Sequence, residues 1–142
     1  MAMQSQAADA RVLRILLIED DPVDAAWLTE MINEKCPTSE VVHGASLPDA
    51  LSALAQRSID TVFVAVHPDG EGGSIEGTRE IVRRAGRRSV VALVNAAEMA
   101  HAAEIRASGV KFVYRKHPIM RTAQIRKQEL REKWEARVAD RA

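Results

Sequence analysis

The sequence predicts an α/β domain built on a parallel sheet of five strands, with helices on both faces. Three observations predict it. Short apolar runs recur along the chain, each followed by polar or turn-forming residues. Between these runs, apolar side chains return at helical spacing. The length of 142 residues, 46% of them hydrophobic, suits a single domain with one continuous sheet.

Composition excludes several classes of protein. Twenty basic residues balance twenty acidic ones, so the overall charge favours neither DNA nor an anionic membrane as a partner. The single cysteine, Cys36, excludes an internal disulfide and suits a reducing compartment. No apolar run approaches the roughly 20 residues that span a bilayer, and residues 1–11 lack the apolar region of a secretory signal. We therefore expect a cytoplasmic protein.

The chain is expected to begin its fold with a strand and a helix. Residues 13–18 form an apolar run followed at once by acids, which is typical of a buried parallel strand. Asp21 and Pro22 then provide an N-cap and a first-turn proline for a helix that runs to about Lys35. Pro37 prevents that helix from continuing.

A second strand, a second helix and a third strand follow. The second strand is expected at residues 40–43. Ser46 with Asp49 three residues later resembles a capping box, which marks the start of the second helix. Residues 61–66 form another apolar run and predict a fully buried third strand.

The second half of the chain repeats the alternation. Gly and Pro residues in 67–73 predict a loop, after which Ile75, Ile81 and Val82 mark a third helix. The remaining elements are expected at residues 89–94 (strand), 97–107 (helix), 110–114 (strand) and from about 119 to the end (a long polar helix).

In sheets of this kind the functional crevice lies beyond the carboxyl ends of the strands. The candidate residues there share a position just after a strand: Glu19, Asp20 and Asp21, residues 65–70, Val94 and Asn95, and residues 115–118.

These segments resemble a response-regulator receiver domain over about residues 12–130. Residues 14–22, the strand ending at Ala65 with its Pro-Asp-Gly turn, and residues 109–118 are the most telling stretches. The resemblance implies a doubly wound, flavodoxin/CheY-like sheet of order 2-1-3-4-5 with an extended C-terminal helix. The expected organisation is a disordered leader (1–11), a receiver-like domain (12–120) and a last helix with a charged extension (121–142).

The resemblance also implies a phosphoryl-transfer pocket, which this sequence does not complete. In the family an acidic pair holds Mg²⁺, an aspartate accepts the phosphoryl group, and a hydroxyl and a lysine bind its oxygens. The acidic pair falls on Glu19 and Asp20, the acceptor position on Ala65 and the hydroxyl position on Val94. A methyl group is not a nucleophile. We therefore expect a degenerate, non-enzymatic pseudo-receiver.

The lysine position is open between two residues. Counting from Gly109 places it at Lys116, which we favour, and counting back from Pro118 places it at His117. Two acids without a third carboxylate predict no cofactor beyond weakly bound Mg²⁺, and a salt bridge from Lys116 that closes the pocket is preferred.

Other ligand chemistries receive less support from the sequence. The four histidines fall on four different elements without metal-ligand spacing, so zinc is not expected, although His67 lies beside the crevice.

A displaced acceptor acid, Asp69 or Asp21, gives an alternative in which the protein is an atypical phosphorylated receiver.

A cluster of arginines supports a second alternative. Arginine forks suit phosphates and guanine edges, and some receiver-like domains bind cyclic di-GMP through arginines. The candidate ligands are Arg83, Arg84, Arg87 and Arg88. The competing interpretation is a solvated turn at the edge of the sheet opposite the crevice.

The last helix supports the favoured function. Leu130, Trp134 and Val138 are spaced by four residues and form one stripe on a highly charged helix. If exposed, such a stripe is an unusual apolar patch; the alternative is that Trp134 packs on its own domain. We therefore expect a phosphorylation-independent signalling module that forms a homodimer or docks a protein partner, such as a sensor kinase or an output protein.

Overall fold

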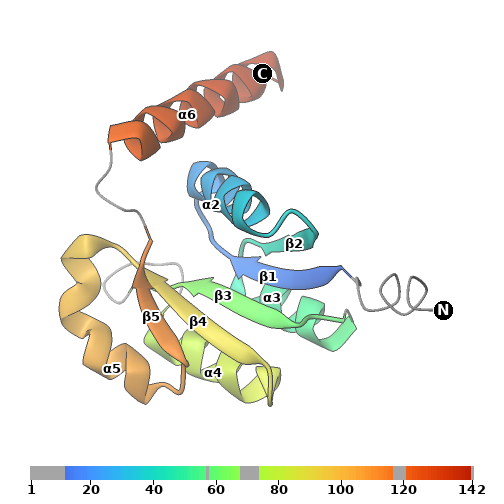
Figure 1. Cartoon of the computed structure of the whole chain (residues 1–142), viewed down its shortest axis with the longest axis vertical. Helices are drawn as coiled ribbons and strands as arrows, with labels where there is room; N and C mark the ends of the chain where they lie inside the picture. Colours follow the sequence, from blue (N-terminus) through green and yellow to red (C-terminus); the bar gives the residue numbers. More distant parts are fainter. Residues whose placement is uncertain (1–11, 57, 68–73, 117–120, 142) are drawn as a thin grey trace, which may run out of the picture.

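The computed structural model describes residues 12–56, 58–67, 74–116 and 121–141 (Figure 1). Five strands form one parallel sheet in the order β2-β1-β3-β4-β5, which confirms the predicted fold class and strand order. The strands are β1 (Leu13–Ile18), β2 (Ser39–Gly44), β3 (Thr61–Ala65), β4 (Ser89–Val94) and β5 (Phe112–Arg115).

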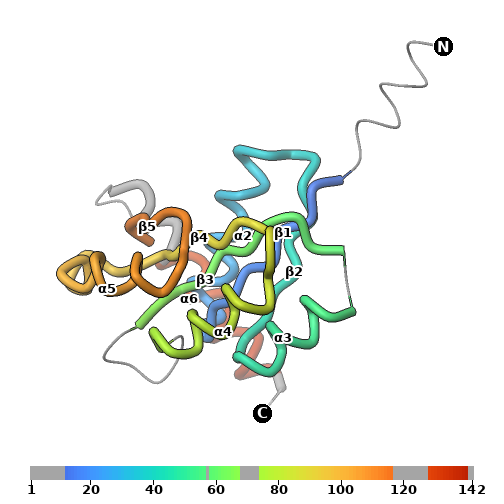
Figure 2. Tube along the Cα trace, turned by 90° about the horizontal axis from the view of Figure 1, so that it is seen from below, coloured from blue at the N-terminus to red at the C-terminus, as the bar shows by residue number. Residues whose placement is uncertain are grey.

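Helices cover both faces of this sheet. α2 and α6 lie on one face, and α3, α4 and α5 lie on the other (Figure 1). Seen from below, α5 lies at the β5 edge and α3 near the β2 edge (Figure 2). The helices are α2 (Pro22–Lys35), α3 (Leu47–Gln56), α4 (Ile75–Ala85), the 3₁₀ helix η1 (Ala96–His101), α5 (Ala102–Ala107) and α6 (Arg121–Arg141).

The predicted starts of the first two helices are confirmed. The Asp21 carboxylate caps α2 by accepting hydrogen bonds from the backbone N–H groups of Val23, at 2.9 Å, and Asp24, at 3.3 Å. The Ser46 hydroxyl accepts a hydrogen bond from the Asp49 N–H at 3.3 Å, immediately before α3. The fourth predicted helix differs, because residues 96–101 wind as a 3₁₀ helix before α5 begins.

Alternation along the strands divides the core into two layers. In β1, Leu16 and Ile18 pack towards α3 and α4, whereas Leu17 packs towards α2. The same alternation in β3 and β4 places successive side chains in opposite layers. Both faces of the central strands are therefore buried, as expected for a doubly wound sheet.

The last helix packs on its own domain through part of its predicted stripe. α6 packs against α2 (Figure 1), where Leu130 is buried among Trp27 and Leu28 and Trp134 is partly buried beside them. Only Val138, 46% exposed, remains open to solvent. The structure thus departs from the expected exposed patch, because Leu130 and Trp134 share the helix face that meets α2.

Two predictions lie wholly or partly outside the described residues. The leader, residues 1–11, is not described, and neither are His117 and the candidate acceptor Asp69. Among the described helices, none has the length and apolarity needed to cross a membrane.

Candidate functional site

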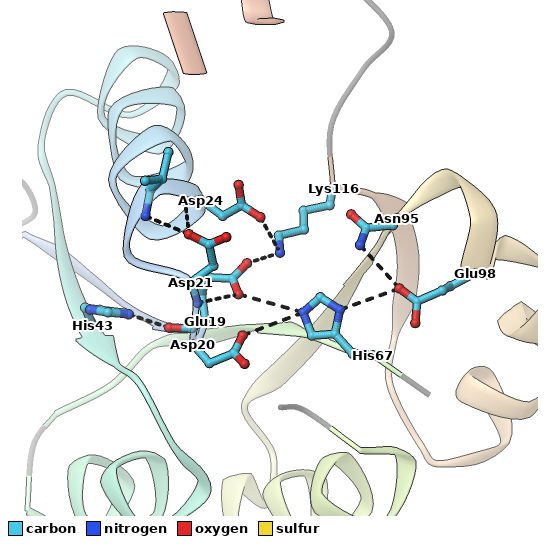
Figure 3. A network of polar contacts seen from close by, with 10 residues as sticks. Glu19, Asp20, Asp21, Asp24, His43, His67, Asn95, Glu98 and Lys116 are labelled. Carbon is cyan, nitrogen blue, oxygen red and sulfur yellow. Dashed lines mark hydrogen bonds and ion pairs between the residues drawn. The ribbon is translucent and has the colours of Figure 1, made fainter. Parts of the chain in front are cut away.

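The ends of three strands lie at one edge of the sheet and bring together residues that are far apart in sequence (Figure 3). Glu19 and Asp20 follow β1, His67 follows β3, and Lys116 follows β5. Backbone hydrogen bonds continue past the strand ends and fix these segments, with the Lys116 N–H donating to the Val94 carbonyl at 2.7 Å. This edge is therefore the crevice that the sheet topology predicts.

Lys116 closes the inner part of the crevice. Its side chain is only 1% exposed, and Nζ contacts Glu19 Oε1 and, at 2.9 Å, Asp24 Oδ2. Burial alone would lower the pKa of Lys116, but the contacts with Glu19 and Asp24 raise it above its usual value. The ammonium group therefore stays charged between two carboxylates.

The Glu19 carboxylate is buried yet ionised. Burial raises its pKa, but contacts with His67 and Lys116 and the backbone N–H of Asp21 outweigh burial and lower the pKa to about 2. The two oxygens face different partners: Oε1 contacts Lys116, and Oε2 accepts the Asp21 N–H at 3.2 Å and faces His67. Glu19 thus divides the crevice into an inner and an outer part.

His67 lies in the outer part, surrounded by carboxylates. Its Nε2 is 3.8 Å from Glu19 Oε2 and 3.8 Å from Asp20 Oδ1, and its Nδ1 is 3.5 Å from Glu98 Oε1. The nearby Glu19 carboxylate raises the pKa of His67 against the opposing effect of burial. Burial and the Glu19 charge together raise the pKa of Asp20. The outer part of the crevice therefore places three carboxylates, those of Glu19, Asp20 and Glu98, around one imidazole.

Two residues of the crevice were not predicted. Asp24 sits in the first turn of α2, which turns its side chain back over the end of β1 towards Lys116. Glu98 sits in η1, where it accepts a hydrogen bond from Asn95 Nδ2 at 3.3 Å. Asp24 could have been predicted from its place one turn after the N-cap of α2. No sequence feature indicated Glu98, because residues 96–101 were expected to form an ordinary α-helix.

The two positions predicted to depart from the receiver pattern lie at the ends of β3 and β4. Ala65 and Val94 end neighbouring strands, and both are buried. A cavity of about 370 Å³ opens beside the Ala65 methyl group, and Glu19, Asp20 and Ser74 also line it. The site therefore has room for a side chain where the methyl group stands.

The residues present do not fit a Mg²⁺ ion. Mg²⁺ needs near-octahedral oxygen ligands, but Ala65 supplies no oxygen and one oxygen of Glu19 is already bound to Lys116. Among the described residues, the third side chain grouped with Glu19 and Asp20 is His67, which offers an imidazole nitrogen instead of an oxygen.

The arginine cluster lies at the C-terminal end of α4, near the opposite ends of the strands. Arg83 Nη2 and Arg84 Nε pair with Glu80 Oε1 at 2.6 and 3.1 Å. Arg88 Nε donates to the Ala85 carbonyl at 3.0 Å, and Arg87 is exposed. The structure does not join these arginines to the acidic crevice.

Comparison with solved structures shows the receiver fold. A response regulator protein from Burkholderia pseudomallei, with a phosphorylated aspartic acid, a calcium ion and citrate, is 16% identical over 89% of this chain and 73% of its own, with a TM-score of 0.63. A CheY-like receiver domain protein from Methanospirillum hungatei JF-1 is 16% identical over 91% of this chain and 95% of its own, with a TM-score of 0.61.

The fold also occurs in a chain described as an adenylate cyclase, from Rhodopirellula baltica. It is 18% identical over 92% of this chain and 95% of its own, with a TM-score of 0.61. No protein-family profile and no curated protein matches this sequence. At these identities the similarity shows the fold, and function has to be argued from the site.

Proposed function

We propose that this protein is a pseudo-receiver: a signalling module that acts by protein contact and does not depend on phosphorylation at the end of β3. The receiver fold of its structural neighbours supports a signalling role. One observation carries the rest of the proposal. The lysine expected to bind a phosphoryl group is buried between Glu19 and Asp24, and the residue at the acceptor position is Ala65.

In this ion pair the Glu19 and Asp24 carboxylates provide the negative charge that a phosphoryl group would otherwise place beside Lys116. Phosphoryl transfer relies on an acceptor oxygen and on positive charge that neutralises the transferred oxygens. Here the positive charge of Lys116 is already balanced by two carboxylates, and Val94 offers no hydroxyl group. The inner crevice is therefore held closed by a permanent ion pair.

We expect acetyl phosphate with Mg²⁺ to leave the intact mass of the full chain unchanged, because Ala65 has no nucleophile and Asp21 is engaged as the N-cap of α2. A phosphorylatable receiver domain treated in parallel serves as the positive control. A stable, hydroxylamine-sensitive phosphoryl adduct on this chain would contradict the proposal and favour a displaced acceptor acid.

The proposed contact surface is the outer face of β5. Phe112 and Tyr114 project from the same face, are 47% and 54% exposed, and stack with ring centroids 5.7 Å apart. α6 makes its main contacts with α2, and both rings are exposed in the structure. Exposed aromatic pairs are typical of protein interfaces, and one patch that pairs with itself forms a two-fold dimer.

Sedimentation should show a concentration-dependent dimer that the double variant Phe112→Ser/Tyr114→Ser abolishes, because the substitutions remove the apolar contact without touching the buried core. Val138→Ser, at the exposed outer end of α6, is the matched control and should leave the dimer intact.

The sedimentation experiment also separates the candidate surfaces. Loss of the dimer in Val138→Ser alone would move the interface to the last helix. If the full chain is still monomeric at roughly 100 µM, a concentration at which even a weak dimer would form, self-association is overturned. The β5 surface would then bind a different protein.

A further inference from the structure

The outer crevice places three metal-ligand types around one point. Glu19, Asp20 and His67 each offer one ligand atom, and these three atoms lie within 4.8 Å of one another. The two nitrogen–oxygen distances are 3.8 Å, which is too long for a hydrogen bond. Ligands that share one zinc ion at about 2.0–2.2 Å stand about 3.4 Å apart in a tetrahedron. Each nitrogen–oxygen distance would have to shorten by about 0.4 Å, and the two carboxylate oxygens, at most 4.8 Å apart, would have to approach to about the same 3.4 Å when an ion binds.

The imidazole is already oriented for such an ion. Glu98 Oε1 lies 3.5 Å from Nδ1 of His67, on the side away from Glu19 and Asp20, and Asn95 Nδ2 donates to the same Glu98 oxygen (Figure 3). A carboxylate on the outer nitrogen of a metal-bound histidine fixes the tautomer and increases the basicity of the ligand nitrogen. With Glu98 on Nδ1, the Nε2 atom of His67 faces Glu19 and Asp20.

The charges of the crevice also favour a cation. Among the described residues, the ammonium of Lys116 contacts Glu19 Oε1 and Asp24, on the inner side. Within the described part of the chain, no lysine or arginine pairs with Asp20, which follows Glu19 and faces His67 at 3.8 Å. A divalent ion in the outer part would relieve the repulsion between these two carboxylates.

The ligand set selects the class of metal. Two carboxylates and one imidazole suit Zn²⁺ and similar first-row ions, whereas Mg²⁺ prefers oxygen ligands alone. Three protein ligands leave a fourth position, and the neighbouring cavity of about 370 Å³ provides space for water or a small anion there.

We propose that Glu19, Asp20 and His67 bind one Zn²⁺ ion, with Glu98 as the residue that positions the imidazole. This goes beyond the proposed function, since the ion sits in the outer crevice and the proposed protein contact lies on β5. Failure of one proposal leaves the other standing.

Isothermal titration of the EDTA-stripped full chain with ZnCl₂ tests the site. The background is Cys36→Ser, because the exposed thiol is a competing ligand. We expect one Zn²⁺ per chain with micromolar or tighter affinity, and no comparable heat with MgCl₂. His67→Gln should abolish binding, and Glu98→Gln should weaken it about 10–100-fold.

His101→Gln is the matched control, since that histidine pairs with Glu104 on a different part of the surface. It should leave the affinity unchanged. Circular dichroism and a thermal unfolding midpoint for each variant confirm that it is folded. Zinc binding that survives in His67→Gln, or that occurs only at millimolar concentration, would overturn the proposal.

Discussion

Replacing Lys116 with methionine is expected to lower the free energy of unfolding by about 3–5 kcal/mol, because the substitution removes one partner of a buried ion pair and leaves the other charges in place. Lys116 is 1% exposed and lies on both Glu19 and Asp24. Methionine preserves most of the packing volume of the lysine stem, so the decrease in the free energy of unfolding can be assigned to the missing positive charge. Urea unfolding at neutral pH measures it.

The pH dependence of this variant has a definite sign. In the native protein the pKa of Glu19 is about 2, below its ordinary value of 4.5, so its contribution to stability is present above 4.5 and is lost as the pH falls towards 2. Without the ammonium group, burial dominates and the Glu19 pKa rises. The difference between the variant and the native protein should therefore shrink as the pH is lowered below about 5.

Two further variants test the cause of the loss. Lys111→Met, which removes an exposed lysine that lies near the Phe112 ring, should change stability by about 0.5–1 kcal/mol or less. Combining Lys116→Met with Glu19→Gln and Asp24→Asn removes the buried charges together and should recover much of the stability. A loss under about 1 kcal/mol for Lys116→Met would contradict the buried ion pair.

The fold was predictable because its signals are local. Buried parallel strands are short apolar runs, so residues 13–18 and 89–94 were placed with the bounds that the structure shows. Asp21 and Pro22 fixed the start of α2 by cap chemistry. The 3₁₀ helix at residues 96–101 was missed, because its composition of three alanines, a glutamate, a methionine and a histidine is equally typical of an α-helix.

The candidate site was predictable only in part. The topology rule placed Glu19, Asp20 and Lys116 at one edge, but spacing along the chain said nothing about which side chains would touch. Zinc was not expected from the sequence, because the ligands come from the ends of two strands rather than from one short motif. Likewise, the stripe on α6 was visible as a pattern, but the surface it packs against depends on where the helix lies.

Placing an aspartate at position 65 is expected to make stability depend on Mg²⁺. The added carboxylate would enter the cavity beside Glu19 and Asp20, where the Ala65 methyl group is now buried. Without metal, the extra negative charge should destabilise Ala65→Asp by about 3 kcal/mol. With three carboxylates the outer crevice becomes a hard oxygen site suited to Mg²⁺. Unfolding midpoints with EDTA and with Mg²⁺ measure the effect.

At a Mg²⁺ concentration about 100-fold above its dissociation constant, binding should restore about 2.7 kcal/mol, most of the loss. Ala65→Asn has nearly the same size without the charge, so it should show no response to Mg²⁺, and neither should the native chain. If Ala65→Asp is as stable as the native protein in EDTA, the new carboxylate has drawn Lys116 away from Asp24. The ion pair that closes the inner crevice would then be a weaker constraint than its burial implies.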